Sequence, residues 1–283
     1  MLRLAIQKSG RLSDDSLQLI RECGISFVSS SYKLKVEASN FPLEILFLRD
    51  DDIPGYVQDG VADLGIVGQN VLVEAGGAGL EVEPLGFGKC RLSLAVPRTA
   101  AYASAADLQG KSIATSYPRL LGEYLAGQGV QATLHTLSGS VEIAPSIGLA
   151  DAICDLVSSG STLLGNGLRE VETIFRSEAV LIAAPQLSAE KQDLLAQLRF
   201  RMQAVRRAQR SKYILLNAPT TALEAVKALL PGIKAPTITP LAEPGWVSVQ
   251  SVVDEDNFWH IADQLQAIGA EGILVLAIEK RVG

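Results

Sequence analysis

The sequence predicts an α/β core built on largely parallel strands, followed by a small domain of the split β-α-β type. From residue 1 to about residue 185, short apolar runs alternate with segments of helical periodicity, which indicates strands covered by helices. Residues 211–283 instead follow the order β-α-β-β-α-β, which is typical of ferredoxin-like domains. The length of 283 residues leaves room for two domains of about 150 residues each.

The first part of the core alternates strands with helices. Strands are predicted at residues 2–7, 43–48, 63–67, 90–96, 112–115 and 132–137. Helices are predicted at residues 13–23, 53–59, 69–75, 105–108 and 120–126. Ser13 is expected to cap its helix, with Asp14 and Asp15 in the first turn, where carboxylates interact favourably with the helix dipole.

A long helix is predicted at the end of the core. It follows strands at residues 152–157, 171–175 and 179–183, and it runs from about residue 188 to residue 210. Residues 199–212 carry six positive charges and no acid. Such a run could attract nucleic acid or phosphate, but we favour a solvated helix that connects two domains.

The C-terminal domain is predicted to contain four strands and two helices. The strands are residues 213–217, 237–241, 246–253 and 272–278. Thr221 and Glu224 form a capping-box pattern at the start of a helix that runs to Leu230. Asp256 is expected to cap the second helix, which Gly269 ends.

Scarce residue types exclude several classes of protein. The cysteines and histidines are Cys23, Cys90, Cys154, His135 and His260. They form neither a C-x-x-C pair nor an H-E-x-x-H motif, and neither histidine stands beside a nucleophile elbow, so zinc and catalytic-triad chemistry are not expected. We expect Cys90 and Cys154 to be small core residues and His135 and His260 to be structural. The net charge of −6 argues against a general nucleic-acid binder.

The sequence also indicates the cellular compartment in which the protein is expected. Its first residues alternate apolar with charged side chains and lack the apolar stretch of a signal peptide. No apolar run reaches the roughly 20 residues of a membrane helix, and widely spaced cysteines suit a reducing compartment. We therefore expect a cytoplasmic protein with no membrane partner.

The segment over residues 150–163 is the most informative for function. On a strand, Asp151, Ile153 and Asp155 share one face. The residues that follow are Ser158, Ser159, Gly160, Ser161 and Thr162, which we call the 158–162 loop. Its amides and hydroxyls could cradle a phosphate, and an upstream carboxylate could hold ribose hydroxyls or a Mg²⁺ that accompanies pyrophosphate. The alternative is an ordinary Ser/Gly turn with surface aspartates.

Cationic residues occur at three other turns. Lys8 and Arg11 flank Gly10 between the first strand and the first helix, where an anion could bind. Lys89, Arg91 and Arg119 lie at two further turns and could meet a triphosphate, and Glu142 follows another strand. Ligands of open α/β sheets bind at the carboxyl ends of strands, so these turns could converge. For each residue taken alone, a solvated surface charge is the favoured interpretation.

Taken together, these segments resemble the long-form ATP phosphoribosyltransferases over essentially the whole chain. The segments are residues 5–12 (AIQKSGRL), 49–54 (RDDDIP), 63–68 (DLGIVG), 90–95 (CRLSLA), 113–118 (IATSYP), 139–142 (GSVE), 148–157 (GLADAICDLV), 166–172 (NGLREVE) and 273–280 (ILVLAIEK). The 158–162 loop differs slightly from the Ser-Thr-Gly-Ala-Thr common in that family, but it keeps the amides.

The resemblance implies a two-lobed catalytic core like that of periplasmic binding proteins. Residues 1–98 and 179–210 would form the first lobe with a connector helix, and residues 99–178 the second. Residues 211–283 would form a ferredoxin-like, ACT-like regulatory domain that binds histidine as feedback inhibitor. Dimers that assemble into hexamers are implied, and no separate regulatory subunit is expected.

The implied reaction condenses ATP with phosphoribosyl pyrophosphate to N1-(5-phosphoribosyl)-ATP and pyrophosphate, the first step of histidine biosynthesis, with Mg²⁺ as cofactor. By resemblance, the catalytic residues are Asp155, Lys8 and Arg11. The 158–162 loop with Asp155 and, less closely, Asp151 would bind the ribosyl donor. ATP would meet Lys8, Gly10, Arg11, Leu12 and Arg49, and histidine would meet Thr237, Thr239, Leu241 and Ser248. Direct protein ligation of the metal is not expected, Asp155 being the one exception considered.

Two alternatives remain open. A solute-binding module without catalysis would share the core fold, although Lys8, Arg11 and the 158–162 loop speak against it. Another phosphoribosyltransferase is the nearest enzymatic rival, and the C-terminal domain speaks against that.

Overall fold

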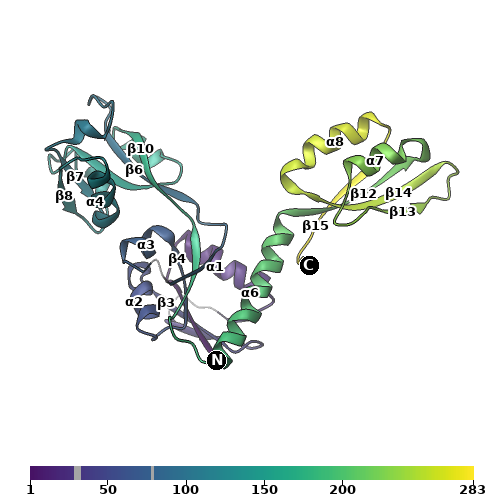
Figure 1. Cartoon of the computed structure of the whole chain (residues 1–283), viewed down its shortest axis with the longest axis horizontal. Coiled ribbons are helices and arrows are strands. Elements are labelled where there is room, and N and C mark those ends of the chain that lie inside the picture. Colours follow the sequence, from purple (N-terminus) through teal and green to yellow (C-terminus); the bar gives the residue numbers. More distant parts are fainter. Residues whose placement is uncertain (29–32, 78–79) are drawn as a thin grey trace. The chain divides into compact units, whose positions relative to one another are not determined.

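The computed structural model describes residues 1–28, 33–77 and 80–283. The chain forms two compact units that divide inside helix α6 (Ala189–Gln209), between Leu194 and Leu195, and Glu22–Gly24 are grouped with the second unit. The first unit contains two lobes, each built on its own sheet, and the second unit contains the C-terminal sheet (Figure 1).

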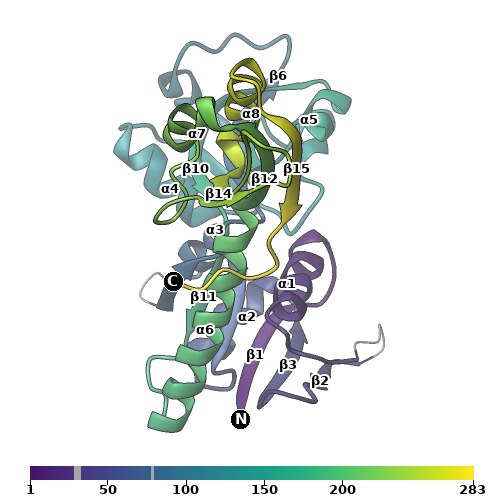
Figure 2. The same ribbon diagram turned by 90° about the vertical axis from the view of Figure 1, so that its right-hand side faces the viewer.

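Lobe I is built on a sheet with the strand order β2-β3-β1-β4-β11-β5. Its strands are β1 (Leu2–Gln7), β2 (Lys35–Glu37), β3 (Leu43–Leu48), β4 (Leu64–Gly68), β5 (Glu81–Pro84) and β11 (Ala179–Ala183). Its helices are α1 (Arg11–Glu22), α2 (Ile53–Gln58) and α3 (Gln69–Glu74). β1 pairs in parallel with β3 and β4, and it lies beside β3 in Figure 2. Leu4 and Ile6 on one face of this sheet, and Ala5 and Val67 on the other, are all fully buried, so both faces are covered.

Lobe II is built on a sheet with the strand order β10-β6-β9-β7-β8. Its strands are β6 (Cys90–Pro97), β7 (Ser112–Thr115), β8 (Thr133–Thr136), β9 (Ala152–Val157) and β10 (Leu168–Ser177). Its helices are α4 (Pro118–Gly127) and the short α5 (Ser161–Gly165). β7 pairs in parallel with β8 and β9, whereas β6 pairs antiparallel with β9 and β10.

The prediction of largely parallel strands is wrong, because both sheets are mixed. The chain crosses between the lobes twice, between β5 and β6 and again between β10 and β11. Strands that enter a sheet from the other lobe run against their neighbours, as β11 does beside β4. β6 belongs to the second sheet, so the lobe boundary predicted after residue 98 lies too late. The predicted two-lobed architecture itself is confirmed, because each lobe is built on its own sheet.

The C-terminal unit confirms the predicted β-α-β-β-α-β order. Its strands are β12 (Ser211–Pro219), β13 (Thr237–Pro240), β14 (Trp246–Asp254) and β15 (Glu271–Ala277), and its helices are α7 (Leu223–Leu229) and α8 (Phe258–Ala267). The sheet order is β13-β14-β12-β15 with every pair antiparallel, which is the ferredoxin-like topology. Both helices cover one face of this sheet, over a core that includes Ile214, Val249 and Leu265 (Figure 1).

The helix caps differ from the predictions. α1 begins at Arg11, so Ser13 lies inside its first turn and is buried there. A 3₁₀ turn over Thr220–Ala222 precedes α7, and no side-chain bond caps that helix, so the capping box predicted there is wrong. Asp254, not Asp256, accepts the capping bond before α8. α1 starts earlier than predicted, and 3₁₀ turns precede α7 and α8, so other residues stand at the ends of these helices.

The sequence does not predict two short strands of lobe I. β2 and β5 have only three and four residues, and they are the two edge strands of their sheet. Among the helices that the structure describes, none is long and apolar enough to cross a bilayer.

Candidate functional site

Cationic side chains gather where two strands of lobe I end. Gln7 pairs with Leu48 at the carboxyl ends of the parallel strands β1 and β3, and the amide of Lys8 donates to the carbonyl of Leu48 at 2.8 Å. Lys8 and Arg49, the next residues of the two strands, therefore lie at the same sheet edge, and both are exposed. This edge is the part of lobe I that could meet an anion.

The turn after β1 carries the chain directly into α1. Gly10 has a φ of 97°, a conformation that residues with a side chain rarely adopt, and its carbonyl accepts the first helical bond, from Asp14 at 3.1 Å. Arg11 is the first residue of α1 and is exposed, and Leu12 behind it is half-buried. The glycine thus allows the tight turn that places Arg11 close to Lys8.

The 158–162 loop lies at the carboxyl end of β9 in lobe II. Gly160 has a φ of 81°, and the hydroxyls of Ser159 and Ser161 lie 3.0 Å apart. In the described part of the chain, the amides of Ser159, Gly160 and Thr162 donate to no protein acceptor. The loop therefore offers exposed hydroxyls and unpaired amides, as binding of an oxyanion requires.

A hydrogen bond joins the cationic edge of lobe I to this loop. The Arg11 guanidinium donates from Nη2 to the Ser158 hydroxyl at 3.1 Å. The two residues are far apart in sequence and belong to different sheets. The structure thus brings together Lys8, Gly10 and Arg11 with the loop.

Asp155 is the carboxylate nearest to the loop along β9. It is half-buried, and its Oδ1 accepts from the Leu156 amide at 2.8 Å. Burial raises its pKa above the ordinary range, and the charge of Glu142 raises it further, against a lowering by the Leu156 bond. Glu142, predicted after another strand end, therefore lies close enough to act on Asp155.

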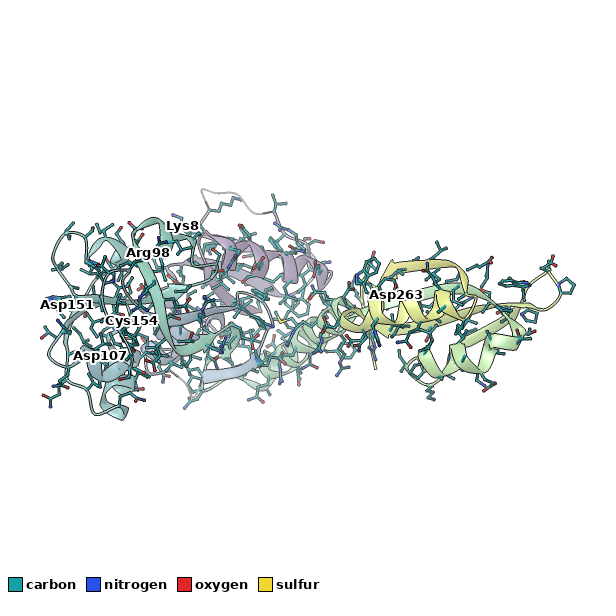
Figure 3. The ribbon with its side chains drawn as sticks, turned by 90° about the horizontal axis from the view of Figure 1, so that it is seen from above. Lys8, Arg98, Asp107, Asp151, Cys154 and Asp263 are labelled. Atoms are coloured by element: carbon teal, nitrogen blue, oxygen red, sulfur yellow. The ribbon has the colours of Figure 1, made fainter. Side chains whose placement is uncertain are left out.

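Asp151 is not brought to the loop. It precedes β9, so it lies at the opposite end of the strand from residue 158, and Figure 3 shows it at the outer edge of lobe II. Its carboxylate accepts from the Ser112 amide and hydroxyl, both at 2.8 Å, and these bonds lower its pKa. Strand periodicity gives two residues a common face but not a common end, so Asp151 falls outside the site.

Sequence reasoning missed a polar cluster between the lobes. Asn70, in α3 of lobe I, is 3% exposed, and its amide group donates to the Tyr117 hydroxyl of lobe II at 3.0 Å. Its Oδ1 accepts from the Ser177 hydroxyl at 2.7 Å, where the chain crosses between lobes. Burial raises the pKa of Tyr117, and the nearby carboxylates of Asp155 and Asp50 raise it further. Nothing in the local sequence signals this cluster, because its members come from three distant segments.

Two predicted cations are already paired. Arg91 holds Glu170 through two bonds of 2.6 Å, and Arg119 holds Glu123 at 3.0 Å. Their charges are therefore partly neutralised, which leaves Lys8, Arg11 and Arg49 as the cations best placed for an anionic ligand.

The side chains that could act as metal ligands indicate which kind of metal site is possible. Within residues 1–28, 33–77 and 80–283, no group of three or more His, Cys, Asp or Glu side chains could hold a metal ion. In the described part of the chain, Asp155 is the carboxylate that β9 carries shortly before the loop. This set fits Mg²⁺ bound mainly by the phosphates of a substrate, with one or two carboxylates at most.

The residues predicted for an inhibitor lie at one edge of the C-terminal sheet. Thr239 pairs with Ser248 across β13 and β14, and Thr237 lies two residues along on the same face. Val249 packs in the core under the helices, so Ser248 points to the opposite, uncovered face. Leu241 follows β13, and its amide donates to the Trp246 carbonyl. The structure thus places three hydroxyls on one open face.

Comparison with known proteins identifies family profiles and relatives that match this chain. The ATP phosphoribosyltransferase profile matches residues 49–204, and the profile of the HisG, C-terminal domain matches residues 208–280. An ATP phosphoribosyltransferase of Cytophaga hutchinsonii is 61% identical over 282 residues, covering 100% of this chain and 99% of that protein. Another, of Parabacteroides distasonis, is 54% identical and covers 100% of both.

A solved structure supports the core fold. It is the ATP phosphoribosyl transferase (HisG:HisZ) complex from Thermotoga maritima, with 28% identity and a TM-score of 0.61. The match covers 99% of that chain and 72% of this one. Part of this chain therefore has no counterpart in the shorter protein.

Proposed function

This chain belongs to the ATP phosphoribosyltransferase family, and we propose that it condenses ATP with phosphoribosyl pyrophosphate to N1-(5-phosphoribosyl)-ATP and pyrophosphate. The observation that carries the proposal is the bond between Arg11 and Ser158, which joins the cationic edge of lobe I to the 158–162 loop. Two polyanionic substrates need both a phosphate cradle and cations, and these meet here.

Each substrate has a proposed place. The 158–162 loop binds the 5-phosphate of the ribosyl donor through its amides and hydroxyls, and Asp155 accepts from the ribose hydroxyls. ATP and the leaving pyrophosphate lie against the lobe I edge, formed by Lys8, Gly10, Arg11, Leu12 and Arg49.

The reaction is a displacement at the anomeric carbon. Adenine N1 supplies the electron pair for the new bond, while the bond from that carbon to oxygen breaks and pyrophosphate leaves with its electrons. Lys8 and Arg11 stabilise the charge that develops on the pyrophosphate, and the loop holds the ribose in line for attack. Mg²⁺ would neutralise pyrophosphate charge, held by substrate phosphates and, at most, Asp155. No protein nucleophile is needed, which is consistent with the scarcity of His and Cys.

The C-terminal domain has a proposed regulatory role. Histidine binds at the hydroxyl face formed by Thr237, Thr239 and Ser248, beside Leu241, and inhibits the first step of its own synthesis. The protein assembles as dimers and hexamers and needs no separate regulatory subunit, because it carries this domain itself. Its phosphorylated substrates are cytoplasmic metabolites, and we place its action there.

The test is to incubate the protein with ATP, phosphoribosyl pyrophosphate and Mg²⁺ and to follow the absorbance of phosphoribosyl-ATP. Product that depends on both substrates supports the proposal. Saturable binding of either substrate without any product contradicts it and favours a solute-binding module instead.

A further inference from the structure

We infer that Arg91 is a positioning residue for the phosphoribosyl donor, because it orients the first peptide group of the 158–162 loop. The inference rests on the proposed function of that loop and adds to it a residue that does not itself touch substrate. It starts from the contacts of one guanidinium group.

The Arg91 guanidinium is fixed on two sides. Nε and Nη2 donate to the two carboxylate oxygens of Glu170, each at 2.6 Å, and this bidentate pair fixes the plane of the group. Its remaining nitrogen, Nη1, donates to the backbone carbonyl of Ser158 at 3.1 Å. Arg91 therefore ties β10 to the first residue of the loop.

Glu170 is itself held in place. The Ser93 hydroxyl donates to its Oε1 at 2.8 Å, and Ser93 is buried. Hydrogen bonding to Arg91 lowers the pKa of Glu170, which keeps it ionised as the partner of a cation. The carboxylate and guanidinium are 26% and 30% exposed, so the pair is shielded enough to be rigid.

The bond to Ser158 has a geometric consequence. In a trans peptide the carbonyl and the following N–H point in opposite directions, and the chain has no cis peptide bond among its described residues. Since the Ser158 carbonyl points at Arg91, the Ser159 N–H points away from Arg91. That amide has no protein acceptor in the described structure, so it is free to donate to a phosphate.

The kinetic consequence falls on one substrate. If the Ser158 peptide rotates, the loop loses an aimed amide, and binding of the 5-phosphate weakens. ATP meets the lobe I edge instead. Among the described residues, the hydrogen bonds of Arg91 go to Glu170 and Ser158 and do not reach that edge. A general loss of stability would instead impair both substrates and turnover together.

The test compares KM for each substrate and kcat in wild type, Arg91→Ala and Glu170→Gln. Arg91→Ala should raise KM for phosphoribosyl pyrophosphate by about tenfold or more, as expected for a lost charge-assisted bond, with KM for ATP within about threefold. Glu170→Gln should also raise KM for phosphoribosyl pyrophosphate, but by a smaller factor. The amide oxygen of the new side chain can still accept one hydrogen bond from Arg91, so the guanidinium remains partly held.

Arg169→Ala is the matched control. Arg169 lies on the same strand as Glu170 and donates to a backbone carbonyl, that of Ala100 at 3.0 Å, outside the site. It should leave both KM values near those of wild type, and thermal unfolding should show that all variants fold.

Each outcome decides a separate claim. If wild type forms phosphoribosyl-ATP and Arg91→Ala leaves KM for the donor unchanged, or raises both KM values equally, the inference is wrong and the proposed function stands. If wild type forms no product, the proposed function is wrong and the inference falls with it.

Discussion

Two aspartates on one strand segment show what residue spacing can and cannot predict. Their shared strand face predicts that Asp151 and Asp155 both lie near a phosphate loop. Only Asp155 lies by the loop, while Asp151 is bound by Ser112 at the other end of β9. Spacing predicts the face from local geometry, but the end of the strand that forms a site depends on neighbouring strands far away in sequence.

Asp155 also predicts a pH dependence. Burial and the charge of Glu142 raise its pKa, so it becomes protonated, and loses its charge, at a higher pH than an ordinary aspartate. We expect activity to fall with protonation as pH decreases. Glu142→Gln removes one cause of the raised pKa, so the acid limb of the kcat/KM profile should move to lower pH.

The measurement is the pH profile of both proteins with saturating ATP. Glu123→Gln, an exposed substitution on α4, is the control and should leave the profile in place. An acid limb that Glu142→Gln moves to higher pH, or does not move, would contradict the assignment.

At the scale of elements, the strands and helices were largely predictable, and their ends were not. Alternation and helical periodicity predict β1, β9 and α8, because these patterns are local. The pairing of β10 with β6, across two bulges in register, is not local, and neither is the entry of β11 into the other sheet. These pairings are what give each lobe its mixed sheet.

The start of α4 shows a cap that no local pattern reveals. The Glu74 carboxylate, at the end of α3, accepts from the amides of Arg119 and Leu120 at 2.7 and 2.9 Å. It thus satisfies two amides at a helix N-terminus, where a negative charge is also favoured. Glu74→Ala should lower the free energy of unfolding by about 1–2 kcal/mol.

Denaturant unfolding measures this change. Glu123→Ala is the control, because its pair with Arg119 is exposed on both sides and should contribute about 0.3–0.5 kcal/mol. Equal losses in the free energy of unfolding for the two variants would show that the Glu74 cap stabilises the protein no more than an exposed ion pair does.

At the scale of the whole chain, the proposed site depends on the two crossings between lobes. They allow α1 of lobe I to meet the 158–162 loop of lobe II, through Arg11 and Ser158. Sequence motifs predict which turns carry the chemistry, yet the buried contact of Asn70 with Tyr117 becomes visible only in three dimensions. Contacts between distant segments leave no pattern in a single sequence.

The C-terminal unit adds a prediction on regulation. Thr239 and Ser248 share the open face of its sheet, so Thr239→Val with Ser248→Ala should raise the histidine concentration for half-inhibition by about tenfold or more, because hydroxyl hydrogen bonds are lost. Initial rates at increasing histidine measure it. Thr221→Ala, in the exposed turn before α7, should not alter inhibition. Inhibition that is undiminished in the double variant would refute the assigned face.

The central claim is that the ribosyl donor binds at the end of β9 formed by Asp155 and the 158–162 loop. The most direct measurement is kcat/KM for phosphoribosyl pyrophosphate in Asp155→Asn and Asp151→Asn, two identical substitutions at opposite ends of one strand. Asp155→Asn should lose about a hundredfold or more, because charge-assisted bonds to the ribose are lost. Asp151→Asn should stay within about threefold of wild type, since it is distant from the site. Equal losses in the two variants, or a larger loss in Asp151→Asn, would contradict the account.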